Sequence, residues 1–227
     1  MADTLQAIAR SLGADVKTLS TISNNVANMH TPGYRGVRAI PEFSDTVGRE
    51  VVMGSALDQR DGVLAQTSND LDVALRGPGF FVVERDGRML LARAGAFRTD
   101  AEGRLVTAGG DVAIGYSGAI QMPAGKVRFE RDGQIFVGDQ GVGQLQIVAV
   151  ADPSRLLSAG NGAYAYDGGL AEWKGSVVQG ALERANVDAA EETVRLMETT
   201  RHAESVQRAI SIYDKAMDTG INQIGGN

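Results

Sequence analysis

The stretch FFVVERDGRMLLAR, residues 80–93, decides the fold of the middle of this chain. Two short runs rich in apolar residues flank the dipeptide Asp86-Gly87, which is a strong signal for a two-residue turn between antiparallel strands. The pattern returns at 126–137, where Asp132-Gly133 separates two further runs in the same way. We therefore predict a β-hairpin with a two-residue turn at both places.

Further strand candidates lie at 145–151 and 163–166, and glycine is frequent throughout this region. We predict a mainly antiparallel β domain over residues 71–185. The preceding residues 35–70 have apolar positions without a clear period, so we expect an extended linker there.

The N-terminal segment, residues 1–34, has one apolar stripe at spacings of three and four, which is typical of a helix. The stripe consists of Leu5, Ile8, Leu12, Val16, Leu19, Ile22 and Val26. Thr31-Pro32-Gly33 then predicts a type II turn, because proline suits its second position and glycine its third.

The C-terminal segment, residues 186–227, alternates by three and four more strictly, which is the seam of a coiled coil. Its members are Leu196, Thr199, Ala203, Val206, Ile210, Tyr213, Met217, Gly220 and Ile224. Asp188 and Glu191 have capping-box spacing at its start. The predicted fold class is α+β, with a central β domain bracketed by terminal helices that pair as a coiled coil.

Composition excludes several function classes. The net charge of −6 argues against nucleic-acid binding, since no excess of Lys and Arg is present to displace phosphate counterions. The chain has no cysteine and hence no thiolate metal site. Residues 1–12 lack the apolar core of a cleaved signal peptide. This favours either a cytoplasmic protein or export by a route that needs no cleaved signal.

We predict no catalytic, cofactor-binding or metal-binding residues and no small-molecule substrate, so the chain is not expected to be an enzyme. The two histidines, His30 and His202, have no triad or ligand partners at a suitable spacing. Asp70 and Asp72 would share one face of a strand, and with Glu84 they leave a cell-wall hydrolase as an alternative. The segment 77–79 is glycine-rich but lacks the Lys and Ser/Thr of a phosphate loop.

Two helices with narrow apolar seams need partners, which points to a subunit that polymerises through its terminal helices. The predicted assembly interface consists of Ile8, Leu12, Val16, Ile22, Asn25, Val26, Leu196, Val206, Ile210, Tyr213 and Met217. Spacing alone also fits an α+β monomer whose helices pack on its own sheet, or a secreted binding module that uses the β domain.

Four blocks of sequence, in order, resemble the bacterial flagellar axial proteins. They are ISNNVAN at 22–28 with TPGYR at 31–35, LDVALRGPGFFVV at 71–83, AGAFRTD at 94–100 with GRLVT at 103–107, and ALERANVD at 181–188 with the AEE of 190–192. In length, the chain resembles the members of this family that form the basal-body rod and have a single β domain. The resemblance is greatest to those of the proximal rod, and the distal rod is the alternative. Arg201-His202-Ala203 departs from the aromatic-containing segment that is more usual there.

The resemblance implies a structural subunit of the periplasmic flagellar rod that transmits torque for motility. It implies other rod subunits, copies of itself and the flagellar type III export apparatus as partners, and export without a cleaved signal peptide. We hypothesise that the terminal segments are poorly ordered in the monomer and fold on joining the rod, because unpartnered seams cannot offset the entropy of ordering them.

Overall fold

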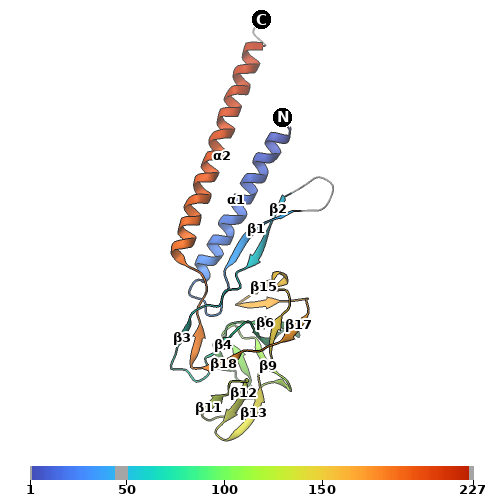
Figure 1. The fold of residues 1–227 in the computed structure, drawn as a ribbon, viewed down its shortest axis with the longest axis vertical. Coiled ribbons are helices and arrows are strands. Elements are labelled where there is room, and N and C mark those ends of the chain that lie inside the picture. The colour runs from blue at the N-terminus through green and yellow to red at the C-terminus, as the bar shows by residue number, and fades with distance from the viewer. Residues whose placement is uncertain (1, 44–50, 225–227) are drawn as a thin grey trace. The chain divides into compact units, whose positions relative to one another are not determined.

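A computed structural model describes residues 2–43 and 51–224 of the chain. The chain forms two compact units. The helical unit comprises Met1–Ala27, Val37–Ala56 and Asp188–Asn227, and the β unit comprises Asn28–Gly36 and Leu57–Val187. The predicted α+β class is confirmed, with a helix at each end of the chain and an antiparallel β domain between them (Figure 1).

The helical unit contains α1 (Ala2–Asn28), α2 (Ala189–Ile224) and a two-stranded sheet of β1 (Val37–Phe43) and β2 (Val51–Leu57). These two strands lie in the segment where the sequence predicted only an extended linker; its residues 44–50 are outside the described part of the chain. Neither described helix has an apolar stretch long enough to cross a membrane. The coiled-coil pairing of the helices stays a prediction.

Local sequence signals set the helix ends. After α1, Tyr34 N–H donates to the Thr31 carbonyl over 3.2 Å, and Gly33 has a φ of +67°, as the predicted type II turn requires. Asp188 caps α2, because its Oδ1 accepts from the N–H groups of Ala190 and Glu191 at 2.8 and 3.3 Å. The Glu191 carboxylate pairs with Arg195 at 2.6 Å, on the next turn of the same helix.

The β unit is built from short strands. Their bounds are β3 (Leu64–Gln66), β4 (Val73–Arg76), β5 (Phe80–Arg85), β6 (Arg88–Ala92), β7 (Phe97–Thr99), β8 (Leu105–Thr107), β9 (Val112–Gly115), β10 (Gly118–Ala119), β11 (Val127–Phe129), β12 (Gln134–Val137), β13 (Gln140–Gln144), β14 (Ile147–Val150), β15 (Leu157–Gly160), β16 (Ala163–Ala165), β17 (Leu170–Glu172), β18 (Ser176–Gln179) and β19 (Ala181–Glu183). A short 3₁₀ helix, Pro153–Arg155, precedes β15.

The main sheet has ten strands with the path β15-β16-β6-β5-β9-β8-β7, to which β10, β14 and β17 add at the sides. Alternate residues of β5 enter two different cores: Phe81 and Val83 enter one, and Phe80 and Val82 the other. Both faces of the central strand are therefore buried. Smaller sheets complete the unit: β11-β12-β13, and the pairs β18-β4 and β19-β3.

The hairpin at 80–93 is confirmed. Arg85 pairs with Arg88, and the two residues between them, Asp86 and Gly87, have φ values of +52° and +76°. Two successive positive φ values are the mark of a type I′ turn.

The second hairpin is one residue longer than we predicted. Phe129 pairs with Ile135, and Glu130 N–H donates to the Gln134 carbonyl, which leaves a three-residue loop ending at Gly133 with a φ of +88°. Phe129 and Ile135 are both buried in the same core. Moving the register by one residue would turn one of them to the opposite face.

The predicted placement of Asp70 and Asp72 on one strand face is wrong. Asp70 lies in a turn in which Asp72 N–H donates to the Asn69 carbonyl, and β4 begins only at Val73. The Asp72 carboxylate accepts from the Asn69 side chain over 2.9 Å and is buried.

Candidate assembly interface

Two polar contacts show how the helices of the helical unit lie. Asp15 contacts His202 Nδ1 over 2.9 Å, and Asn25 Nδ2 donates to Glu192 Oε1 over 3.1 Å. The contacts are ten residues apart on each helix and occur in opposite order (25 − 15 and 202 − 192), so the helices run antiparallel alongside each other for about 15 Å at this point. In Figure 1 α2 continues past the first turn of α1.

The predicted interface residues fall into three groups. Ile22 and Asn25 are buried, while Val16 (66% exposed), Val26 and Leu196 are exposed. The half-buried group consists of Ile8, Leu12, Val206, Ile210 and Tyr213. The Met217 side chain lies outside what the structure describes. Their participation in contacts between subunits remains a prediction.

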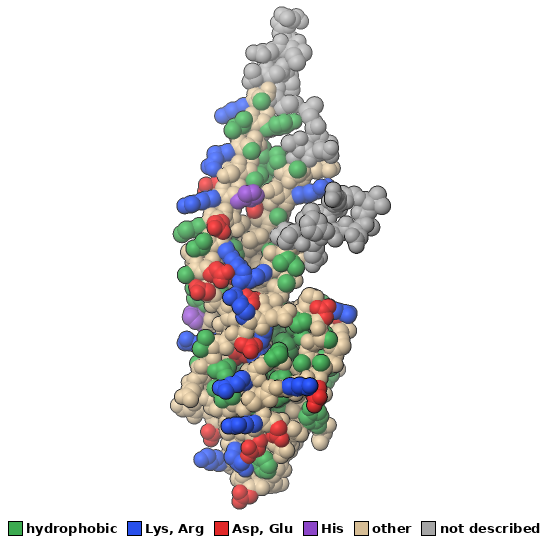
Figure 2. Space-filling model, viewed as in Figure 1, with side chains coloured by type: hydrophobic (Ala, Val, Ile, Leu, Met, Phe, Trp, Pro, Cys, Tyr) green, Lys and Arg blue, Asp and Glu red, His purple; other side chains and the backbone are tan. Residues whose placement is uncertain are grey.

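The helical unit exposes further apolar side chains on α2. Val194, Met197 and Ile212 are each more than half exposed. Figure 2 shows hydrophobic side chains on the surface of this unit among charged ones. Single exposed apolar side chains are common on protein surfaces, and it is a contiguous apolar patch that marks a protein–protein contact.

Asn25 is 1% exposed and lies in a small polar site of the helical unit. Its Oδ1 accepts from Val37 N–H over 2.8 Å, and its Nδ2 donates to the Val37 carbonyl over 2.8 Å as well as to Glu192. Burial raises the pKa of Glu192, and the hydrogen bond from Asn25 partly opposes the rise. Glu192 Oε2 has no hydrogen-bond partner among the described residues.

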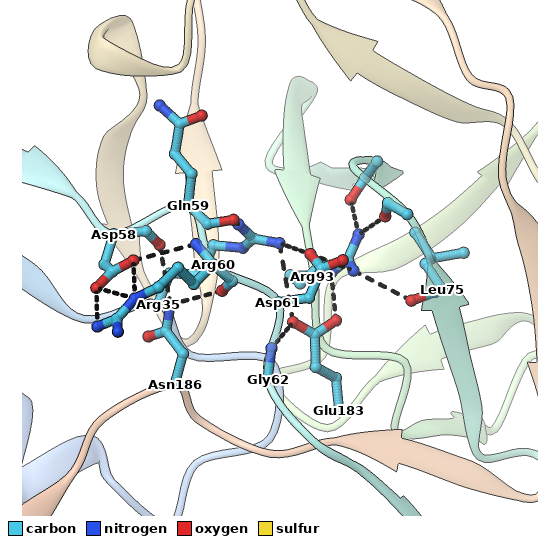
Figure 3. A network of polar contacts seen from close by, with 12 residues as sticks. Arg35, Asp58, Gln59, Arg60, Asp61, Gly62, Leu75, Arg93, Glu183 and Asn186 are labelled. Carbon is cyan, nitrogen blue, oxygen red and sulfur yellow. Dashed lines mark hydrogen bonds and ion pairs between the residues drawn. The ribbon is translucent and has the colours of Figure 1, made fainter.

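A second polar site, in the β unit, surrounds Arg93 (Figure 3). The Arg93 side chain has no exposed surface, and its five N–H groups have five acceptors. Nε donates to Glu183 Oε2 over 2.5 Å, and the other four donate to Asp61 and to the carbonyls of Leu75, Gly77 and Gly79. Burial lowers the pKa of Arg93, and the charge of Glu183 opposes this shift.

Three separate segments meet at this site. Glu183 Oε1 accepts from Gly62 N–H over 2.9 Å, and its backbone carbonyl accepts from Gly33 N–H over 2.7 Å. Arg35 donates to the Gln59 carbonyl and to Asp61.

Asn186 ties the same segments together. Its Oδ1 accepts from Gly36 N–H over 2.7 Å, and its Nδ2 donates to the carbonyls of Asp58 and Arg60 over 3.0 and 2.7 Å. Arg93, Glu183 and Asn186 were not among the predicted site residues. One signal was available for Glu183, which shares a strand face with the buried Ala181 and so places a charge at a core position.

The described residues offer no metal site, since no three His, Cys, Asp or Glu side chains among them are grouped to hold an ion.

Three family models match successive parts of the chain. "Flagella basal body rod protein" matches residues 12–35, "Flagellar hook protein FlgE/F/G D1 domain" matches 74–142, and "Flagellar basal body rod FlgEFG protein C-terminal" matches 178–224. These ranges contain Asn25, Arg93 and Glu183 respectively.

Curated relatives match nearly the whole chain. The flagellar basal-body rod protein FlgG of Agrobacterium fabrum is 31% identical over 248 residues, covering 91% of this chain and 94% of the relative. FlgG of Buchnera aphidicola subsp. Acyrthosiphon pisum is 31% identical over 246 residues, with the same coverage. FlgF of Caulobacter vibrioides is 28% identical over 226 residues and covers 92% of each chain. The chain therefore belongs to the flagellar basal-body rod protein family, whose members are structural subunits of the rod in the flagellar basal body.

Proposed function

We propose that this protein is a subunit of the proximal part of the rod, and that it polymerises through its terminal helices and transmits torque for motility. Its partners are copies of itself and neighbouring rod and hook subunits. The proposal includes export through the flagellar type III apparatus and a place in the periplasmic rod. The proposal includes no catalysis, nucleic acid or small-molecule substrate.

The observation that carries the proposal is the pair of exposed stripes on the helices. The stripe on α1 consists of small residues at spacings of four and three, all exposed: Ala9, Gly13, Val16, Ser20, Ser23 and Ala27. The stripe on α2 has longer side chains at the same kind of spacing, also exposed: Val194, Met197, Arg201, Ser205, Arg208 and Ile212. The first and last residues of each stripe are 18 positions apart in the sequence (27 − 9 and 212 − 194).

The two stripes complement each other in size. Small residues let another helix approach closely, and a seam of this spacing follows a partner helix over several turns. If the α2 stripe of one copy packs on the α1 stripe of the next, the contact is heterologous, and repetition of a contact that does not close produces a helical filament. This is the geometry that a rod requires.

Alignment lengths favour the proximal rod over the distal rod. The FlgF alignment covers 92% of this chain in 226 positions, whereas the two FlgG alignments need 246 and 248 positions for 91%. The FlgG relatives thus require about 20 more positions with gaps (248 against 226). An electron micrograph of basal bodies from a strain that lacks this gene should show that the rod stops at its proximal end. Arrest beyond that end would favour the distal rod.

The helix contact is tested by restoring the deletion strain with full-length variants. Ser20→Leu places a bulky side chain in the α1 stripe, where the subunit itself leaves the position exposed. We expect unchanged thermal unfolding of the purified subunit and loss of motility. Lys17→Leu adds the same side chain one position away from Val16 and off the stripe, and it should swim as the wild type does. A motile Ser20→Leu strain would contradict assembly through this stripe.

A further inference from the structure

Two successive backbone amides, those of Gly36 and Val37, each donate to an asparagine side chain from a distant part of the sequence. Gly36 N–H donates to Asn186 Oδ1 over 2.7 Å, and Val37 N–H donates to Asn25 Oδ1 over 2.8 Å. Residues 36 and 37 are also where the chain leaves the β unit and enters the helical unit. The backbone is therefore held by a side-chain amide on each side of this passage.

Both asparagines use their whole amide group. Asn25 Nδ2 donates to the Val37 carbonyl and to Glu192, and Asn186 Nδ2 donates to the carbonyls of Asp58 and Arg60. A carboxylate of the same shape has no N–H to give to these acceptors, and an aliphatic side chain has neither a donor nor an acceptor. The chemistry of both positions thus selects asparagine.

The chain passes between the two units four times, at 27/28, 36/37, 56/57 and 187/188. Each passage has a partner in these contacts within five residues. Asn25 precedes the first passage, Gly36 and Val37 form the second, Asp58 follows the third, and Asn186 and Glu192 flank the fourth. Asn25 therefore connects the segments at the first, second and fourth passages within the helical unit, and Asn186 connects those at the second, third and fourth within the β unit.

We propose that Asn25 in the helical unit and Asn186 in the β unit are positioning residues, each of which holds three connecting segments of its own unit together. A force that reaches either unit is then shared by three segments that are hydrogen-bonded to one another inside that unit, instead of stretching each one separately. This inference rests on the proposed torque-bearing function. It gives Asn25 a role inside the subunit, separate from the contact between subunits in which the sequence predicts it.

Site-resolved amide hydrogen exchange on the full-length monomer tests the positioning role directly. Asn186→Ala should accelerate exchange at Gly36 at least tenfold, and Asn25→Ala should do the same at Val37, because each change removes the acceptor of that amide. The matched controls are Gln59→Ala and Ser23→Ala, which alter exposed side chains beside each site and should leave both amides unchanged. Wild-type exchange rates at Gly36 and Val37 in the two asparagine variants would overturn the proposal.

Asn25→Asp provides a second measurement with a different signature. The variant keeps the acceptor for Val37 N–H but places a carboxylate beside the buried Glu192 carboxylate and the Val37 carbonyl. Two such carboxylates share a proton when the pH falls. We expect the protection of the Val37 amide, relative to its intrinsic exchange rate at the same pH, to be weak at pH 7 and to approach the wild-type value near pH 5, a change that Asn25→Ala should lack. Identical pH profiles for the two variants would count against the assigned hydrogen bonds.

The load-bearing part is tested in cells. Strains that carry Asn25→Ala or Asn186→Ala should build complete rods, seen in micrographs of basal bodies, but lose swimming speed more steeply than the wild type as medium viscosity rises. Wild-type speed at every viscosity, despite faster amide exchange, would overturn this part alone. If the wild-type gene itself fails to restore motility to the deletion strain, the proposed rod function is wrong, and the exchange results stand independently.

Discussion

Two buried charged residues, Arg93 and Glu192, differ in how completely their polar atoms are hydrogen-bonded. Arg93 is completely buried, yet each of its N–H groups has an acceptor, so the cost of removing the charge from water is offset within the site. Glu192 is nearly as buried, but one of its carboxylate oxygens has no partner among the described residues. The desolvation cost is thus offset at Arg93, whereas ionisation of Glu192 destabilises the folded state to an extent that depends on pH.

We predict that Glu192→Gln stabilises the helical unit at neutral pH. The pKa of Glu192 is raised in the folded protein, chiefly by burial, so the folded state binds the proton more tightly than the unfolded state. The associated stability is present at low pH and is lost as the pH rises through the folded pKa. The variant keeps an oxygen for Asn25 without the charge.

Thermal unfolding followed by helix circular dichroism from pH 4 to pH 8 tests this prediction. The variant should melt above the wild type at pH 7–8, and the two curves should converge as the pH falls below the usual range of a glutamate. Glu198→Gln, an exposed glutamate on the same helix, is the control and should show no such convergence. A variant that melts below the wild type at pH 8 would show that the charge is favourable where it lies.

The hydrogen-bond partners of the polar residues in these sites could not be predicted from the sequence. Asn25 belongs to the segment ISNNVAN, and the sequence predicts it at an interface between subunits, yet its hydrogen bonds lie inside the subunit. Its partners are a strand in a segment without periodicity and a glutamate 167 residues away, and neither is visible from local spacing. Hydrogen-bond partners of polar side chains depend on tertiary structure, whereas apolar periodicity is a local property.

The helices and hairpins could be predicted more fully from the sequence because their sequence signals are local. Asp86-Gly87 specifies its turn through two positive φ values, and the prediction there is confirmed. The same tetrapeptide, Glu-Arg-Asp-Gly, forms a different turn at 130–133 because burial of Phe129 and Ile135 fixes the register. The buried face of α1 differs in part from the apolar positions that the sequence predicts. Asp15 and Asn25 are buried, whereas the neighbouring Val16 and Val26 are exposed.

Along α1 we predict a gradient of amide protection in the monomer. Near its C-terminal end Thr21, Ile22 and Asn25 are buried, whereas residues 6–10 are half-buried at most. Helix stability in proteins comes largely from tertiary packing, so the first turns should open more readily. Hydrogen exchange should be at least tenfold slower at residues 22–27 than at 6–10. Uniform strong protection from residue 5 to residue 28 would contradict our hypothesis that the terminal segments become ordered on assembly.

At the scale of the molecule, two compact units in one chain need not unfold together. The single tryptophan, Trp173, packs against the main core of the β unit, and most helical residues belong to the other unit. We predict that urea unfolding followed by tryptophan fluorescence and by helix circular dichroism gives two different midpoints.

Arg93→Met should shift the fluorescence transition most, by about 3–5 kcal/mol, because it removes the buried guanidinium that pairs with the buried Glu183 carboxylate at 2.5 Å. Arg98→Met, an exposed arginine of β7, is the control and should change the midpoint little. Coincident transitions that move together in Arg93→Met would show that the two units unfold as one.

The contact between the two helices also depends on the order in which the chain is synthesised. Asp15 and His202, which contact each other, are 187 residues apart, so α1 is synthesised long before its partner exists. All strands of the β unit are made in that interval. The entropy cost of closing a loop grows only slowly with its length, but the contact has to wait until most of the chain has been synthesised. The first helix of the chain is thus the last to be completed, and its amphipathic face must stay out of wrong contacts for the entire period.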